Sequence, residues 1–276
     1  MHKTPGIIYL GIDIQKAFGK EALSPRLKLL ASHPEGDEDR EVEANARLAT
    51  SVYAAGGLVV VSRDWHNPVG TVLEGPGGSR IIDNRSVEEF ERYGVHATPG
   101  TGDSELNAPL QIALRQLEQR DGHARRVIPV DEHEGPPASQ VSVGGGSQRI
   151  VEVHKNMYDV TRKHALRDGA AQGPIEPHTE VVALLRAQPA ESTVILGGKI
   201  AEVCVRATGL SILTELPKLR LVVARDAVSS LPSEVSHSLG MPGKDQVMEE
   251  LRSRGARLQS TAEILEWLRS ECLSPI

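Results

Sequence analysis

The sequence has few cysteines, few aromatic residues and no excess of basic residues. Two cysteines, Cys204 and Cys272, do not indicate a disulfide framework, which fits a reducing, cytoplasmic setting. A formal net charge of −6 without a basic stripe argues against nucleic-acid binding. No apolar run is long enough to cross a membrane, and the N-terminal segment is too short and interrupted for a signal peptide. We therefore expect a cytoplasmic protein without a nucleic-acid or membrane partner.

The order of the apolar runs predicts an α/β protein. Strand-type runs occupy 6–14, 58–62, 149–153, 193–196 and 219–224, with a short extra strand at 127–130. Helical patterns occupy 41–55, 104–117, 178–187, 203–213, 243–254 and 262–269, with a short helical piece at 87–92. Strands that alternate with helices indicate a three-layer α/β/α fold, in which helices cover both faces of a central, mostly parallel sheet.

Two segments are interpreted as irregular. Residues 25–40 are rich in proline and charge, and we interpret them as a loop. The least patterned stretch is 121–148, which we interpret as a surface excursion or lid rather than a domain boundary. We therefore expect residues 1–276 to form a single domain that includes this excursion.

Polar side chains end or follow four of the predicted strands. Asp13 ends the first strand, Asp64 follows the second, Lys155 follows the third, and Cys204 follows the strand at 193–196. Because the carboxyl ends of parallel strands meet at one edge of a sheet, we expect these four side chains to converge. A carboxylate can accept the proton of a thiol, and a lysine can stabilise the charges of both. This combination predicts a nucleophilic cysteine.

Cys204 also lies just inside the start of a predicted helix. The unpaired amides and the dipole of a helix N-terminus favour a thiolate and can stabilise negative charge on a carbonyl oxygen. From this stretch alone, a buried structural cysteine is an equal alternative.

A second group of residues has the types that ligate metals. Asp64 and His66 are two residues apart, so in an extended segment their side chains point the same way. His96, in a later glycine-rich segment, is the best candidate for a third ligand. One aspartate and two histidines suit Zn²⁺, Fe²⁺ or Mn²⁺ with open positions. A D-x-H triplet alone is a weak motif, because most such triplets are surface residues.

Five segments together resemble the isochorismatase-like cysteine hydrolases, and among them the nicotinamidases. The segments are GIDIQKAF, SRDWHNP, YGVHATPGTGDSEL, VHKNMYDVT and GGKIAEVCVRATGLSIL, and the likeness runs from Ile7 to about Ser230. The resemblance implies a catalytic triad of Asp13, Lys155 and Cys204 that hydrolyses nicotinamide to nicotinate and ammonia through a thioester. Such an activity belongs to NAD salvage.

The resemblance also implies roles for further residues. The backbone amides of Ile200 and Cys204 would hold the oxyanion, and the Lys199–Ile200 peptide would be cis. Phe18 and Tyr93 would sandwich the substrate ring. Asp64, His66 and His96 would bind a divalent metal, Zn²⁺ above all, that orients the pyridine. The family often forms homo-oligomers, so we expect one here.

Several positions depart from the family pattern and leave alternatives open. Ala17, Tyr93, Lys199, Ile200 and Glu202 replace commoner residues, and a further histidine that some nicotinamidases have after D-x-H is absent. Ile200 is bulkier than usual beside the expected oxyanion site. The alternative function is therefore hydrolysis of another small amide, such as an N-carbamoyl compound, a ureide or a maleamate-like acid. A non-catalytic protein on this fold is a further alternative, against which the intact triad argues.

Overall fold

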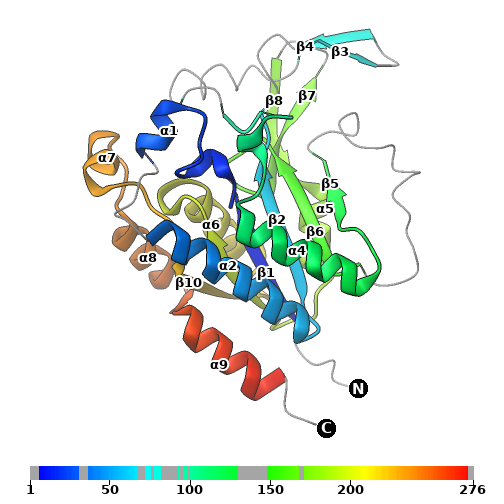
Figure 1. Cartoon of the computed structure of the whole chain (residues 1–276), viewed down its shortest axis with the longest axis vertical. Helices are drawn as coiled ribbons and strands as arrows, with labels where there is room; N and C mark the ends of the chain where they lie inside the picture. The colour runs from blue at the N-terminus through cyan, green and yellow to red at the C-terminus, as the bar shows by residue number, and fades with distance from the viewer. Residues whose placement is uncertain are drawn as a thin grey trace.

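A parallel sheet forms the centre of the molecule (Figure 1). The computed structural model describes residues 6–30, 37–66, 72–75, 78–81, 93, 96–98, 100–129, 148–167 and 171–272. Among these residues, seven strands pair in the order β11-β10-β9-β1-β2-β6-β5, and every pairing is parallel. Their bounds are β1 Ile7–Ile12, β2 Leu58–Asp64, β5 Arg126–Ile128, β6 Ile150–Lys155, β9 Thr193–Gly198, β10 Arg220–Val228 and β11 Arg257–Gln259.

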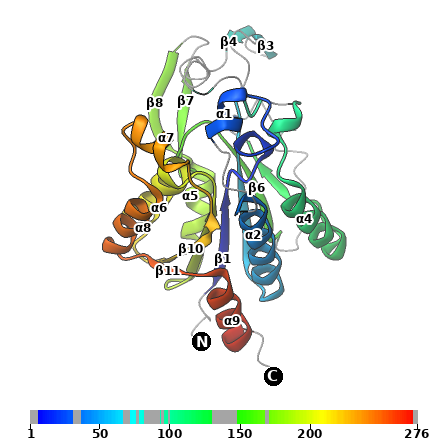
Figure 2. The same ribbon diagram turned by 60° about the vertical axis from the view of Figure 1, so that its left-hand side comes forward.

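Helices cover both faces of this sheet, which gives the three layers predicted from the sequence (Figure 2). One face packs against α2 Asp37–Ala54, α4 Ala108–Asp121 and α9 Thr261–Cys272. The other face packs against α5 Thr179–Arg186, α6 Arg206–Glu215 and α8 Lys244–Ser253. Side chains of β1 alternate between these layers: Tyr9 lies in the first core, and Ile8 and Leu10 lie in the second. A strand buried on both faces needs such a continuous apolar run.

Smaller elements lie beyond the sheet. Two antiparallel hairpins, β3 Val72–Gly75 with β4 Gly78–Ile81 and β7 Arg162–Arg167 with β8 Ala171–Pro177, lie at the same end of the molecule as α1 Pro25–Leu30 (Figure 1). The short helix α7 Ser233–Ser238 precedes α8. Among the described residues, no helix is both long enough and apolar enough to span a membrane.

The sheet and its covering helices follow the sequence pattern, and the connections do so less well. The expected loop at 25–40 is wrong in part, because α1 occupies its start and α2 begins at Asp37. The helix expected from 104 begins only at Ala108, after the short helix η2 Gly102–Ser104. The sequence pattern did not predict the two hairpins, α7 or β11. Their strands and helix are 3 to 7 residues long, which is too short to show a clear hydrophobic period. The expected helical piece at 87–92 and most of the 121–148 excursion, namely 130–147, lie outside the described residues.

The order of the strands creates a switch point beside β1. The chain leaves β1 through α2 on one face of the sheet, and it leaves β9 through α6 on the other face. Connections that depart to opposite faces leave space above the carboxyl ends of the strands, where α/β proteins commonly bind ligands.

Candidate active site

Four neighbouring strands deliver the four predicted polar residues to one edge of the sheet. The strands β9, β1, β2 and β6 are consecutive in the sheet order. Asp13 follows the last residue of β1, whereas Asp64 and Lys155 are the last residues of β2 and β6 and oppose each other in register. Cys204 follows β9 in a single π-helical turn, Ala201–Val205 (η3). The convergence predicted from the strand ends is therefore confirmed.

Lys155 lies at the centre of this group. Its Nζ is 2.6 Å from Oδ2 of Asp13, 3.4 Å from Oδ1 of Asp64 and 3.7 Å from Sγ of Cys204. The side chains of Lys155 and Asp13 are both 0% exposed. A buried ammonium is stable only when opposite charges compensate its lost hydration, and here two carboxylates do so. The thiol, one carboxylate and the ammonium thus form one contiguous group.

Asp13 is held in place from the neighbouring strand. Its backbone has a positive φ of 46°, a conformation that aspartate tolerates better than most residues. Ser62 Oγ donates to Oδ1 of Asp13 over 2.8 Å and accepts from the Asp13 amide over 3.2 Å. Ser62 therefore fixes one carboxylate oxygen and leaves the other facing Lys155.

The turn that carries Cys204 depends on close backbone packing. Gly198 has φ 120°, and a Cβ at this position would lie 2.0 Å from the Ile12 carbonyl oxygen, so only glycine fits. The Lys199–Ile200 peptide is cis, as the sequence resemblance implied. The amides of Val203 and Val205, on either side of Cys204, both donate to the Ile200 carbonyl. The amide of Cys204 lies between them at the start of the helical segment.

Burial and the neighbouring charges act in opposite directions on the pKa values of this group. It raises the pKa of the Cys204 thiol well above its usual value, against the lowering effect of Lys155. It also raises the pKa of Asp13, again opposed by Lys155. Burial lowers the pKa of Lys155, but the charges of Asp13 and Asp64 outweigh it and raise the net value. These shifts favour a neutral thiol beside a charged lysine, and the raised pKa makes the Asp13 carboxylate a stronger base towards the thiol proton.

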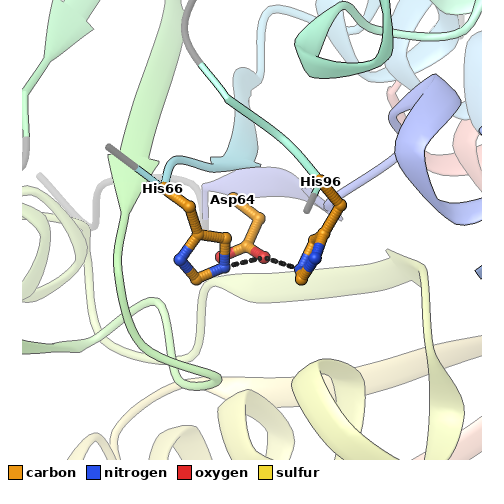
Figure 3. A group of neighbouring side chains, drawn as sticks. All are labelled: Asp64, His66 and His96. Atoms are coloured by element: carbon orange, nitrogen blue, oxygen red, sulfur yellow. Dashed lines mark hydrogen bonds and ion pairs between the residues drawn. The ribbon is translucent and has the colours of Figure 1, made fainter. Parts of the chain in front are cut away.

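Asp64, His66 and His96 form a compact cluster (Figure 3). Oδ2 of Asp64 is 2.9 Å from Nε2 of His66 and 3.8 Å from Nε2 of His96, and one ligand atom from each residue lies within 4.8 Å of the others. All three residues are buried. Burial raises the pKa of Asp64, but His66 and Lys155 lower this pKa by more than burial raises it. The carboxylate therefore stays charged. Two imidazoles and one carboxylate are a donor set that fits a divalent transition metal.

Gln15 supports this cluster, and sequence reasoning missed it. Its Oε1 accepts from the Asp64 amide over 2.6 Å, and its Nε2 donates to the carbonyls of Asp64 and Ser104 over 3.1 and 2.9 Å. The His66 amide donates to the Ala97 carbonyl over 3.1 Å, which ties the two histidine segments together. The signal that could have revealed Gln15 is its position two residues after Asp13, beside the same sheet edge.

Aromatic and apolar side chains border the cluster. The rings of Phe18 and Tyr93 both contact the ring of His96 edge-on, with distances between ring centroids of 5.8 Å and 6.3 Å. Phe18, Tyr93 and Ile200 belong to one buried apolar cluster. Phe18 and Tyr93 therefore lie beside the cluster of Asp64, His66 and His96. Trp65 instead stacks on His154 at 3.9 Å.

The fold is similar to those of several solved hydrolase structures. A nicotinamidase/pyrazinamidase from Bacillus subtilis aligns with a TM-score of 0.57 and 16% identity, over 92% of this chain and 100% of its own. A pyrazinamidase from Pyrococcus horikoshii in complex with zinc aligns with a TM-score of 0.50 and 16% identity, over 93% and 99%. An N-carbamoylsarcosine amidase from Thermoplasma acidophilum aligns with a TM-score of 0.50 and 15% identity, over 93% and 96%.

No family model and no curated protein matches the sequence. The chain thus has the isochorismatase-like three-layer fold, a likeness seen in its structure at 15–16% identity. Similarity at this level establishes the fold, and the chemistry has to be argued from the residues of the site.

Proposed function

We propose that the protein is a cysteine-dependent amidohydrolase that converts nicotinamide and water to nicotinate and ammonia. One observation carries this proposal: Nζ of Lys155 contacts both Asp13 and Cys204, and it also contacts Asp64 of the Asp-His-His cluster. The candidate nucleophile Cys204, its base Asp13 and a group of side chains able to ligate a metal thus lie side by side. The nicotinamidase and pyrazinamidase structures with the same fold support the choice of substrate.

The residues of the triad would act in two half-reactions. Sγ of Cys204 attacks the carboxamide carbon while its proton passes to Asp13. The backbone amides of Ile200 and Cys204 stabilise the oxyanion. Asp13 then protonates the departing ammonia, which leaves a thioester on Cys204. Asp13 next takes a proton from water, the resulting hydroxide attacks the thioester, and nicotinate leaves as the thiol recovers its proton.

Lys155 and the aromatic residues would position these groups. The ammonium of Lys155 balances the charge of Asp13 and stabilises the thiolate as it forms. Phe18 and Tyr93, which border His96, would contact the two faces of the substrate ring. Asp64, His66 and His96 would hold Zn²⁺, which when bound supplies a Lewis-acid partner for the pyridine nitrogen. The zinc complex of the Pyrococcus horikoshii pyrazinamidase favours this metal.

Hydrolysis of a different small amide is the second candidate. The side chain of Ile200 shares the buried cluster of Phe18 and Tyr93, and its bulk there would limit which ring can bind beside the expected oxyanion site. The N-carbamoylsarcosine amidase with the same fold makes N-carbamoyl compounds the first class to try. We propose in addition that residues 1–276 form one domain, and that the protein is a cytoplasmic homo-oligomer.

Ammonia release from nicotinamide tests the proposal. The purified protein should release ammonia, lose this activity on chelation and recover it when Zn²⁺ is added back. Cys204→Ala should abolish turnover, whereas Cys272→Ala, the matched change at the other cysteine, should retain it. Activity of Cys204→Ala equal to that of the wild type would contradict the mechanism. If the wild type releases ammonia faster from an N-carbamoyl compound than from nicotinamide, the second candidate is correct.

A further inference from the structure

A buried ion pair lies beside the segment that carries Phe18, outside the triad and the metal-type cluster. Nζ of Lys199 is 2.7 Å from Oε1 of Glu38, and the two side chains are only 1% and 5% exposed. Lys199 follows the last residue of β9, and Glu38 lies in the first turn of α2. Neither side chain takes part in the chemistry proposed above.

The pair joins three segments that converge on the site. Nζ of Lys199 also donates to the Phe18 carbonyl over 3.0 Å, so the ammonium holds the segment that carries the Phe18 ring. Oε2 of Glu38 accepts from the Lys20 amide over 3.0 Å, two residues further along the same segment. Between these contacts, a Cβ on Gly19 would lie 1.6 Å from Oε1 of Glu38, so the backbone presses directly against the carboxylate.

The other end of Lys199 is part of the proposed oxyanion site. Its amide donates to the Ile12 carbonyl over 2.7 Å, one residue before Asp13, and its carbonyl carbon is bonded to the nitrogen of Ile200. One residue thus contacts the Phe18 segment through its side chain and carries the Ile200 amide through its backbone. A displacement of the Lys199 side chain would therefore change the spacing between the ring-contacting residue and the oxyanion donor.

Stability alone does not account for such a pair. Removing two charges from water costs about as much as their attraction returns, so apolar residues of similar volume are often equally stable or more so. What the pair supplies beyond stability is directional contact: one hydrogen bond joins Lys199 to Glu38, and two more of fixed geometry join the pair to the Phe18–Lys20 segment. Apolar contacts do not impose such directions.

We propose that Lys199 and Glu38 are positioning residues that set the distance between Phe18 and the Ile200 amide. At this distance, Phe18 contacts the substrate ring while the Ile200 amide contacts the oxygen of the carboxamide on the same molecule. This inference rests on the proposed function. It predicts two separable kinetic effects, because Phe18 contributes to substrate binding and the Ile200 amide to stabilisation of the oxyanion.

Kinetics of Lys199→Met and Lys199→Met/Glu38→Met test this role. The double variant leaves no unpaired buried charge, so it should fold even where the single variant does not. With concentrations normalised to the Cys204 thiol that iodoacetamide can titrate, both folded variants should show kcat lowered about 10-fold and a raised KM for nicotinamide. Arg220→Met is the control, because it removes an exposed pair between Arg220 and Glu191 at the start of β10, and it should stay within about two-fold of the wild type. Unchanged kcat and KM in the double variant would overturn the proposal.

A second readout remains if the wild type does not hydrolyse nicotinamide, in which case the proposed substrate is wrong. Iodoacetamide carries a carboxamide, and it alkylates Cys204 by forming a C–S bond as iodide leaves and the thiol proton passes to Asp13. Methyl methanethiosulfonate modifies the same thiol without a carboxamide. The double variant should react with iodoacetamide at least about 5-fold more slowly than the wild type, and with the thiosulfonate at an equal rate. Equal slowing by both reagents would assign the pair a structural role only and overturn the inference.

Discussion

Asp64 and Lys155 oppose each other at the ends of β2 and β6, and the Asp64 carboxylate contacts both Lys155 of the triad and His66 of the metal-type cluster. Oδ1 of Asp64 is 3.4 Å from Nζ of Lys155, while Oδ2 is 2.9 Å from Nε2 of His66. The carboxylate therefore connects the metal-type cluster to the triad through its two oxygens. A change at either residue is expected to alter both groups.

Replacing Lys155 by methionine should destabilise the fold. The substitution leaves Asp13 fully buried without its cation, and uncompensated buried charges cost about 3–5 kcal/mol in comparable cases. Urea unfolding of Lys155→Met should report a loss of this size in the free energy of unfolding. The double variant Asp13→Asn/Lys155→Met should recover part of the loss, because it removes one of the two carboxylates. A single variant within about 1 kcal/mol of the wild type would show that Lys155 does not compensate these charges.

The sequence predicts the layers and the site well for a physical reason. Strands buried on both faces are mostly apolar, so β1, β2, β6 and β9 are visible as runs, and their polar ends mark the edge of the sheet where the candidate site lies. Asp13, Asp64, Lys155 and Cys204 could all be identified in this way. The cis Lys199–Ile200 peptide was accessible only through the resemblance to a family.

Other contacts depend on tertiary structure that one sequence does not encode locally. Gln15 reaches the backbone of Asp64, 49 residues away, and Lys199 reaches Glu38, 161 residues away. A sequence does not show whether a lysine is buried or exposed, and the residues next to Lys199 do not indicate that it is buried. The missed helix α1 has the same cause, because its proline and charged residues suggest a loop, although proline is well tolerated at a first helical position.

Loss of either histidine should weaken metal binding. His66 and His96 each supply one of the three grouped ligand atoms, and even residues that only support ligands change affinity about 10–100-fold. His66→Ala and His96→Ala should therefore bind Zn²⁺ at least this much more weakly, as measured by competition with a chromogenic chelator. His237→Ala, which changes an exposed histidine of α7, is the control and should bind as the wild type does. Wild-type affinity in both site variants would exclude this cluster as the metal site.

The Cys204 thiol should become reactive only at high pH in the absence of substrate. Burial raises its pKa well above the usual value, so at neutral pH the thiolate fraction is smaller than that of a free thiol. The rate of alkylation by iodoacetamide, measured by peptide mass spectrometry, should still be rising at about pH 9, where small-molecule thiols level off. Lys155→Met should be slower still, because it removes the charge that favours the thiolate. A plateau below about pH 8 would mean that the thiol has a lowered pKa, opposite to this expectation.

Glu152 should make the fold sensitive to acid. Its Oε1 is 2.9 Å from both Arg63 and His154, and its Oε2 is 3.0 Å from Arg125. Burial alone raises the pKa of Glu152, but these partners outweigh it and lower the pKa from 4.5 to about 2. A carboxyl group with a depressed pKa stabilises the folded state above its unfolded pKa, and this contribution is lost as the pH falls through the folded pKa.

The resulting window runs from pH 4.5 down to about 2. A shift of this size corresponds to about 3 kcal/mol that Glu152 contributes near neutral pH. Glu152→Gln should therefore be less stable than the wild type by about this amount at about pH 6, and the difference should shrink towards zero as the pH approaches about 2. Urea unfolding across this range gives the comparison, with Glu249→Gln, an exposed partner of Arg252, as the control that should show little change. A stability difference that stays constant with pH would mean that Glu152 acts through packing alone, because only the proton equilibrium of its carboxylate can make the difference vary with pH.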